Sequence, residues 1–266
     1  MLQFIRIIAF IQSYAFSNGT GDVMGKVIAV TSGKGGTGKS TFCVCLAQSL
    51  AGRGKRVLLI DLDEGLRCLD ILLGVESGLV FDLSDVIAGR PVEDAVYSSS
   101  KNSGIYLIPA PAEPGSLSAA ALEDVTGRLI PEYDYLIFDF PAGIDFSLCA
   151  ALPRQTQMIA VCCPDAVSVR DAAEVCRRLP EFDRAPVLVL NRFVAGDMRN
   201  GSVRCIDDII DSSGFRMLGI IPESRELALL ASHNALKRGG KPYRAFDRIA
   251  GRLCGEHIKL PPPKKI

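Results

Sequence analysis

Ten consecutive residues, Ser32 to Thr41 (SGKGGTGKST), constrain this chain more than any other stretch. Gly33, Gly38, Lys39 and Ser40 match the phosphate-binding pattern G-x-x-x-x-G-K-[ST]. Glycines let backbone N–H groups face anionic oxygens, the lysine places a charge at the β- and γ-phosphates, and the serine hydroxyl can bind Mg²⁺. The residues expected to contact a nucleotide are Gly33, Lys34, Gly35, Gly36, Thr37, Gly38, Lys39, Ser40 and Thr41.

The residues around this loop support the interpretation. An apolar run, Val27 to Val30, precedes it, and a segment with helical character, Phe42 to Leu50, follows it. A strand, a glycine-rich loop and a helix in this order are the structural context that the motif requires. The alternative is a glycine-rich turn that binds nothing, and this context argues against it.

Composition limits the possible partners and the compartment. Thirty basic and thirty acidic residues cancel, so no global field draws the molecule onto nucleic acid, and we expect no nucleic-acid partner. The nine cysteines are odd in number, and several, such as Cys43 and Cys162, lie inside apolar runs. This usage is typical of reduced thiols in a cytoplasmic protein.

We divide the chain into three parts. Residues 1–23 form an extension whose apolar segment, Phe4 to Ile11, is far shorter than the ~20 residues that span a bilayer. A signal peptide and a membrane-lying helix are alternatives, but we favour a working start at Met24. Residues 24–256 form one domain, and residues 257–266, with three consecutive prolines, are expected to be an extended, mobile tail.

Short β-rich runs alternate with helical ones from Gly25 onward, which predicts an α/β domain. We expect a mostly parallel, twisted sheet of about seven or eight strands with helices on both faces. This is the three-layer P-loop NTPase fold. The expected strands are Val27–Thr31, Val57–Asp61, Ile105–Pro109, Tyr135–Asp139, Met158–Cys162, Val187–Asn191 and Met217–Ile221. Besides the segment after the loop, the expected helices are Ser118–Leu129, Val169–Leu179, Ile206–Asp211 and Tyr243–Leu253.

Acidic residues end two of the apolar strands, where an open parallel sheet binds its ligand. Asp139 has the position of a Walker B aspartate and is expected to hold Mg²⁺ together with Ser40. Asp61 and Asp63 form a D-x-D pair, so one can orient the metal's water and the other the attacking water. The alternative for each is that it only caps the following turn.

Two further segments bear on nucleotide recognition. Pro141 and Gly143 follow Asp139 in a turn that can sense the γ-phosphate as a switch. Asn191 and Arg192 end a late strand that lacks the aspartate with which GTP-binding proteins recognise guanine, so ATP is the favoured nucleotide. Asn191 can form a hydrogen bond with the edge of the adenine, and Arg192 can stack on the base. Capping of the strand is the alternative for Asn191.

These residues carry a family resemblance. The extra lysine, Lys34, resembles the deviant Walker A motif of the MinD/ParA class of ATPases, and Asp61 to Asp70 (DLDEGLRCLD) is similar to the D-x-D-x-G-L-R-N-L-D motif of its MinD branch. Further similarity lies in Asp139 to Ile144, in Ser168 to Asp171, in Asn191 to Phe193 and in Gly219 to Glu223, so the resemblance runs from Met24 to about Glu256.

The resemblance implies an ATP- and Mg²⁺-dependent dimerisation switch with slow ATPase activity. Lys34 would reach across a homodimer to the partner's phosphates, Asp63 would position the hydrolytic water, and Pro222 and Glu223 would contact nucleotide. The switch residues would be Asp63, Gly65, Pro141 and Gly143. The implied partners are the division inhibitor MinC, a MinE- or DivIVA-type regulator, and the inner face of the cell membrane.

Three departures from the family pattern matter. Cys68 replaces an asparagine and Phe140 a small polar residue, which bears on partner contacts. The tail, with its prolines, cannot form the basic amphipathic helix by which the family binds lipid. The alternatives are a regulator of flagellar number and a ParA-type segregation ATPase, which would need a basic DNA-binding patch. An iron–sulfur reductase ranks last, because no cysteine lies between Cys68 and Cys149.

Overall fold

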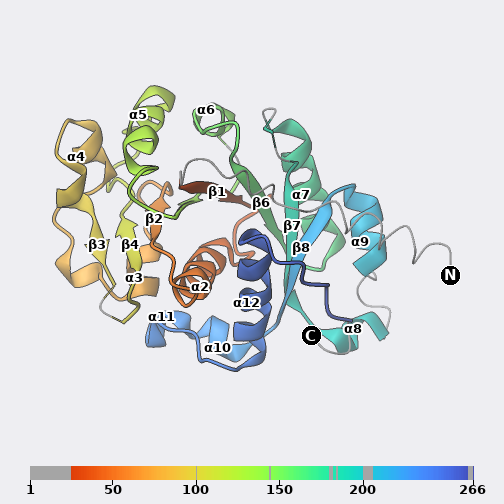
Figure 1. Ribbon diagram of the computed structural model, residues 1–266. Helices are drawn as coiled ribbons and strands as arrows, with labels where there is room; N and C mark the ends of the chain where they lie inside the picture. Colours follow the sequence, from red (N-terminus) through yellow and green to blue (C-terminus); the bar gives the residue numbers. More distant parts are fainter. Residues whose placement is uncertain are drawn as a thin grey trace.

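The computed structural model describes residues 25–262 and 266, apart from 100, 144, 180–181, 184 and 200–205. The extension and the start at Met24 therefore lie outside the described residues. Eight strands form one sheet in the order β3-β4-β2-β5-β1-β6-β7-β8, and all neighbouring pairs are parallel except β3 with β4 (Figure 1). The strands are β1 (Lys26–Thr31), β2 (Val57–Asp61), β3 (Tyr97–Ser98), β4 (Ile105–Ile108), β5 (Tyr135–Asp139), β6 (Gln157–Cys162), β7 (Val187–Phe193) and β8 (Arg216–Pro222).

The seven strands expected from the sequence are all present, and the predicted fold class is confirmed. Strands β2, β5 and β6 are buried along their whole length, as apolar runs covered on both faces must be. The strand that sequence reasoning missed is β3, which has only two residues and therefore no periodicity to detect.

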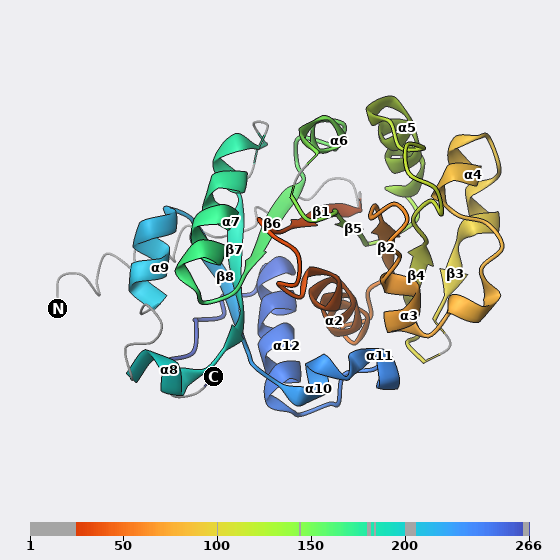
Figure 2. The ribbon, with the colours of Figure 1, turned by 180° about the vertical axis from the view of Figure 1, so that it is seen from behind.

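Helices cover both faces of the sheet (Figures 1 and 2). One face packs against α2 (Lys39–Ala51), α3 (Leu69–Leu73), α11 (Leu230–His233) and α12 (Lys241–Leu253), with α10 (Arg225–Ala228) beside them. On the other face lie α4 (Leu83–Ile87), α5 (Ala119–Leu129), α6 (Phe146–Ala150), α7 (Ala166–Arg178) and α9 (Ile206–Ser213). Helix α8 (Ala195–Arg199) follows β7, and two 3₁₀ turns are η1 (Glu76–Gly78) and η2 (Val92–Ala95).

All five predicted helices exist, with ends shifted by up to three residues. Helix α7 begins at Ala166 because Asp165 caps it by accepting the Ser168 N–H, and α12 begins at Lys241 with a proline in its first turn. Among the residues that the structure describes, sequence reasoning missed six helices of four or five residues, because the 3.6-residue period cannot be read over so short a span.

The sheet brings the carboxyl ends of its parallel strands to one edge. Strand β1 lies between β5 and β6, and Asp61 of β2 is in register with Asp139 of β5. The chain winds from β1 toward β2 on one side and continues with β6 on the other, so the loop after β1 lies at the topological switch point where such sheets bind ligands.

The described part of the predicted tail, residues 257–262 and 266, makes specific contacts. Arg252 of α12 donates hydrogen bonds to the carbonyls of Ile258 at 2.8 Å and Lys259 at 3.0 Å. Ile266 is buried in the hydrophobic cluster between β6–β8 and helices α7 and α9, and Lys241 donates to its main-chain oxygen at 2.9 Å.

Candidate nucleotide-binding site

The loop between β1 and α2 has the backbone of a phosphate cradle. Gly36 and Gly38 have φ angles of 77° and 88°, in the left-handed region that favours glycine. A Cβ at Gly38 would lie 2.4 Å from Nδ2 of Asn191, so a side chain does not fit there. Helix α2 starts directly at Lys39, and its free N–H groups and positive dipole end therefore face the loop.

A cavity of about 420 Å³ opens over this loop, within the size range of small-ligand sites. Its lining combines the loop with residues from the ends of β2, β5 and β7. The lining residues are Ser32, Gly35, Gly36, Thr37, Gly38, Lys39, Ser40, Thr41, Asp63, Cys68, Ile71, Leu72, Ala142 and Arg192. The structure thus gathers most of the residues that sequence reasoning assigned to nucleotide.

Lys39, which lines this cavity, forms a buried ion pair with Asp139. Nζ of Lys39 lies 2.6 Å from Oδ1 of Asp139, and the side chains are 8% and 1% exposed. Burial lowers the pKa of Lys39, but Asp139, with smaller contributions from Cys43 and Asp61, raises it above its ordinary value. Oδ2 of Asp139 is buried without a hydrogen-bond partner among the described residues. A carboxylate oxygen of this kind belongs to the donor set of Mg²⁺, and so does the hydroxyl of Ser40, which lines the cavity.

Asp61 and Asp63 have different surroundings. The Asp61 carboxylate is buried and accepts the backbone N–H groups of Asp63 at 3.0 Å and of Cys68 and Leu69 at 3.4 Å. Burial and the nearby Asp139 raise the pKa of Asp61 to about 7 despite these hydrogen bonds. Asp61 thus holds the turn that follows β2, as the capping alternative describes.

Asp63 is the member of the D-x-D pair that lines the cavity. Its carboxylate makes no hydrogen bond or ion pair with the part of the chain that the structure describes, so both oxygens can accept a proton or a water. Partial burial raises its pKa, Lys39 lowers it and Asp139 raises it, with a net increase. The position suits a residue that orients water, which is what the sequence predicts for Asp63.

Lys34 has a different place from Lys39. It is not among the residues that line the cavity, and its Nζ lies 3.2 Å from Oδ1 of Asp165 at the start of α7. The two side chains are 41% and 50% exposed, so this ion pair is a weak surface contact that can exchange readily. The lysine therefore contacts the start of α7 and stands outside the cavity lining, unlike Lys39.

Of the residues expected to contact the base or the rest of the nucleotide, only Arg192 lines the cavity, whereas Asn191, Pro222 and Glu223 do not. Nδ2 of Asn191 donates to the carbonyl of Thr37 at 2.8 Å, and Asn191 is only 7% exposed, so it fixes the phosphate loop. Arg192, with a φ of 57°, is exposed and lines the cavity. Pro222 and Glu223 lie at the end of β8, where the Glu223 N–H donates to Phe193, outside the cavity lining.

The expected switch residues lie on two loops beside the cavity. The Gly143 N–H donates to the Ser32 carbonyl at 3.1 Å, so this amide has a partner, while Ala142 next to it lines the cavity. Pro141 adjoins Ala142 in the same turn. Gly65 has a φ of 79°, and its N–H donates to Pro111 at 3.1 Å.

Sequence reasoning missed three apolar or thiol side chains of the cavity wall, Cys68, Ile71 and Leu72. They come from the short helix α3 and the residue before it, whose length gave no periodic signal. It also assigned no role to Glu64 and Arg67, although both lie inside the quoted motif. The sequence did contain a signal for these two residues, because they are charged and stand on either side of Gly65 in the turn after β2.

No helix in the described part of the chain combines the length and the apolar character needed to cross a bilayer.

The chain is similar to known proteins along most of its length. A family model described as "CobQ/CobB/MinD/ParA nucleotide binding domain" matches residues 28–236. The septum site-determining protein MinD of Bacillus subtilis is 35% identical over 247 residues, which cover 89% of this chain and 92% of that protein. The Escherichia coli K12 protein of the same name is 30% identical over 250 residues, with 88% and 92% covered.

Solved structures agree with the sequence relatives. The MinC:MinD cell division protein complex of Aquifex aeolicus matches with a TM-score of 0.80 and 32% identity, over 89% of this chain and 98% of that one. MinD of Pyrococcus horikoshii, complexed with Mg-ADP, matches with a TM-score of 0.74 and 26% identity, over 89% and 100%. This chain is therefore a member of the CobQ/CobB/MinD/ParA family of nucleotide-binding proteins, and its relatives lie in the MinD branch.

Proposed function

We propose that this protein is an ATP-dependent dimerisation switch with slow, Mg²⁺-dependent ATPase activity that takes part in placing the division septum. The observation that carries the proposal is the separation of the two loop lysines. Lys39 lies inside the cavity, where it pairs with Asp139, whereas Lys34 stands at the rim, half-exposed and outside the lining. A lysine in this position can serve phosphates in a second subunit, as an arginine finger does.

The site chemistry supports ATP hydrolysis. Ser40 and Asp139 would hold Mg²⁺, which when bound neutralises charge on the phosphates. Lys39 would leave Asp139 for the β- and γ-phosphates, and the loop glycines would direct their N–H groups at the same oxygens. Asp63, whose carboxylate faces the cavity without a described partner, would orient the attacking water. Arg192 is the described residue best placed to contact the base.

A homodimer would form on the edge of the sheet that carries the cavity. Large apolar side chains stand exposed in the segments after β2, β6 and β7, among them Leu66 at 72%, Val167 at 52% and Val194 at 41%. Because these strands are parallel, the segments lie around the same edge as Lys34. Exposed apolar groups around a polar site are typical of a surface that becomes buried by a partner.

The division role follows from the relatives. The matched structure is a complex of MinC with MinD, and the curated relatives are named as septum site-determining proteins. We infer that this chain recruits a MinC-type inhibitor in its ATP-bound form and that a MinE- or DivIVA-type regulator controls its release. The test is co-purification with the MinC protein of the same organism in ATP and in ADP. Binding in ATP only is expected, and binding to a flagellar regulator instead of MinC would favour the alternative function.

We further infer that the ATP-bound dimer is a peripheral protein of the inner membrane face and binds anionic lipid through a basic face. The basic face consists of Arg225, Lys237, Arg238, Lys241, Arg244 and Arg248. Between Arg225 and Arg252 the sequence has seven Lys/Arg and only two Asp/Glu, although the chain as a whole is neutral. None of the six forms an ion pair with an Asp or Glu side chain of the described residues.

The basic face follows from the packing of α12. Ala245, Phe246 and Ile249 are buried against the sheet and α2, which leaves the basic positions of the helix on the opposite side. Figures 1 and 2 show α10 beside the first turns of α12. Arg225 is the first residue of α10, and the next residue, Glu226, accepts the N–H of Lys237 at 2.6 Å, which ties α10 to the segment before α12. Each basic residue near an anionic leaflet contributes roughly 1 kcal/mol to binding, so the set is sufficient for reversible attachment.

Vesicle sedimentation tests this attachment. The triple variant Lys237→Ala/Arg238→Ala/Lys241→Ala should lose ATP-dependent binding to vesicles that contain anionic lipid, and Arg128→Ala/Arg154→Ala/Arg177→Ala, on the opposite layer, should retain it. Binding of the wild type to DNA but not to anionic vesicles would contradict the membrane role and favour a ParA-type function.

A further inference from the structure

We propose that Glu64 and Arg67 are positioning residues that hold Asp63 at the nucleotide cavity by bracing its loop against a distant segment of the chain. The loop, residues 62–68, joins β2 to α3, and the bracing segment, residues 110–117, follows β4. The inference rests on the proposed ATPase function, because it assigns these two residues to the positioning of the hydrolytic water.

The loop is fixed from the inside by Asp61. The Asp61 carboxylate accepts the N–H groups of Asp63, Cys68 and Leu69, which closes the loop around one buried side chain. These bonds fix the two ends of the loop, but they leave its middle, Glu64 to Arg67, to be held from the outside. The two charged side chains of this middle both point to the bracing segment.

Glu64 makes the first brace. Its Oε1 accepts the N–H groups of Ser116 at 2.9 Å and Leu117 at 3.0 Å, and its Oε2 accepts the N–H of Gly115 at 2.9 Å. Three backbone N–H groups converge on one carboxylate, and hydrogen bonds to an ionised group are roughly twice as strong as neutral ones. Glu64 directly follows Asp63 in the chain, so this contact limits the movement of the Asp63 backbone.

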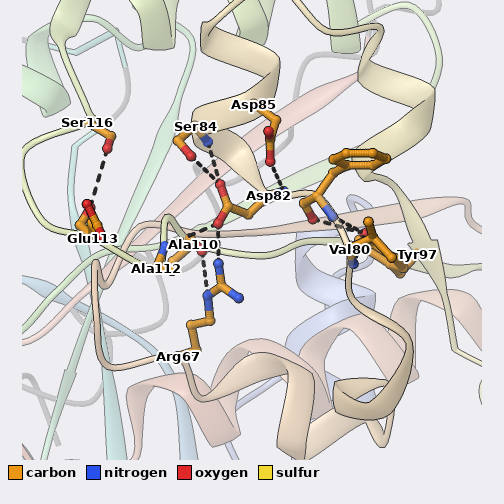
Figure 3. A network of polar contacts seen from close by, with 11 residues as sticks. Arg67, Val80, Asp82, Ser84, Asp85, Tyr97, Ala110, Ala112, Glu113 and Ser116 are labelled. Carbon is orange, nitrogen blue, oxygen red and sulfur yellow. Dashed lines mark hydrogen bonds and ion pairs between the residues drawn. The ribbon is translucent and has the colours of Figure 1, made fainter.

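Arg67 makes the second brace, at the other end of the turn (Figure 3). Its Nε donates to the Ala110 carbonyl at 2.7 Å, and its Nη2 donates to the Asp82 carboxylate. Asp82 in turn accepts the Ala112 N–H at 3.1 Å and caps α4 through the Ser84 N–H at 2.9 Å. Arg67 thus ties the loop to both the bracing segment and the start of α4.

Between the two braces, a backbone bond completes the attachment. The Gly65 N–H donates to the Pro111 carbonyl at 3.1 Å. The loop is therefore bonded to the bracing segment at three successive places, while the Asp63 carboxylate itself has no described partner. The neighbours of Asp63 are thus fixed, while its carboxylate can still accept a proton. Such positioning matters because a displacement of about 1 Å in a reacting group can cost on the order of 100-fold in rate.

The test compares Glu64→Ala with Glu113→Ala, which removes an exposed glutamate from the bracing segment that makes no described side-chain bond. We expect kcat for ATP to fall about tenfold in Glu64→Ala, with the Kd for a fluorescent ADP analogue within about twofold of wild type. Glu64→Gln, which keeps one acceptor oxygen, should recover part of the rate. Glu113→Ala should leave both constants unchanged.

Arg67→Lys provides the second comparison, with Arg128→Lys on the exposed side of α5 as its control. Lysine cannot bridge Ala110 and Asp82 at the same time, so kcat should again fall more than nucleotide affinity. Hydrogen–deuterium exchange in residues 62–68 should be faster in Glu64→Ala and in Arg67→Lys, and unchanged in the controls.

The outcomes separate the two claims. A wild-type protein that binds ATP but never hydrolyses it overturns the proposed function, and the catalytic role of both braces with it. Normal wild-type turnover with unchanged kcat and exchange in Glu64→Ala overturns the bracing alone. An equal loss of kcat and nucleotide affinity would show that the residues only support the fold, which also contradicts the positioning role.

Discussion

Nζ of Lys39 lies 2.6 Å from Oδ1 of Asp139, and the two side chains are almost completely buried. The expected phosphate-binding cation and the expected Mg²⁺ carboxylate are thus partners of one another, and the second oxygen of Asp139 has no described partner. Binding of MgATP would exchange this contact for contacts with phosphate and metal. The pair therefore links stability of the nucleotide-free protein to the chemistry of the site.

Removing one member of this pair should destabilise the nucleotide-free protein strongly. Lys39→Met leaves the buried Asp139 charge unpaired, at a cost of about 3–5 kcal/mol in the free energy of unfolding. The double variant Lys39→Met/Asp139→Asn should recover most of this loss, because it removes both charges of the pair. Urea unfolding measures both values. Lys55→Met, which breaks a half-exposed pair with Asp134, is the control and should change stability by less than about 1 kcal/mol.

Lys34 should matter for turnover and little for stability. Its exposed pair with Asp165 contributes at most about 1 kcal/mol, so Lys34→Ala should unfold at nearly the wild-type urea concentration while losing ATPase activity. If Lys34 acts across the dimer, a mixture of the inactive variants Lys34→Ala and Asp63→Ala should regain activity, since one site of the mixed dimer has both groups. A mixture as inactive as its components would contradict action in trans.

Asn191 should support the phosphate loop without selecting the base. Because its amide donates to Thr37, Asn191→Ala leaves a buried carbonyl unsatisfied and should cost about 1–3 kcal/mol of stability. ADP affinity should fall with the weakened loop, while the ratio of ATP to GTP affinity stays at its wild-type value. Competition binding measures the ratio, and a loss of adenine preference would instead assign Asn191 to the base.

Asp61 should make the free energy of unfolding depend on pH. Burial and Asp139 raise its pKa in the folded protein to about 7, whereas an aspartate in the unfolded chain has a pKa of about 3.9. The folded state therefore binds the extra proton, so this contribution is complete below about pH 4 and is lost as pH rises toward 7, at up to about 1.4 kcal/mol per unit. Urea unfolding between these values should show a steeper decline with pH in wild type than in Asp61→Asn. Parallel curves would refute the assignment.

The sequence predicts the centre of this site better than its periphery. The phosphate loop, Asp63 and Asp139 could be located because each stands at a fixed offset from an apolar strand, and parallel pairing then brings the strand ends together. The direction of a side chain could not be predicted in the same way. Asn191 and Asp61 both lie at strand ends, but hydrogen bonds to the backbone turn one toward Thr37 and the other toward its own loop.

The contacts that were not predictable join segments far apart in the chain. Glu64 and Arg67 look like solvated surface charges in the sequence, and only the fold shows that residues 110–117 lie beside them. The basic face is similar, because the neutral total charge hides seven basic residues gathered between Arg225 and Arg252. The sequence does not show which residues Glu64 and Arg67 contact, whereas the concentration of basic residues could have been counted from it.

The most direct test of the account is the mass of the protein in different nucleotides, measured by light scattering. The Asp63→Ala variant should bind ATP without hydrolysing it, so it should have the mass of a dimer in MgATP and of a monomer in MgADP. Wild type should form the same dimer transiently and return to monomer as ATP is consumed. A single mass in both nucleotides, for both proteins, would contradict the dimerisation switch.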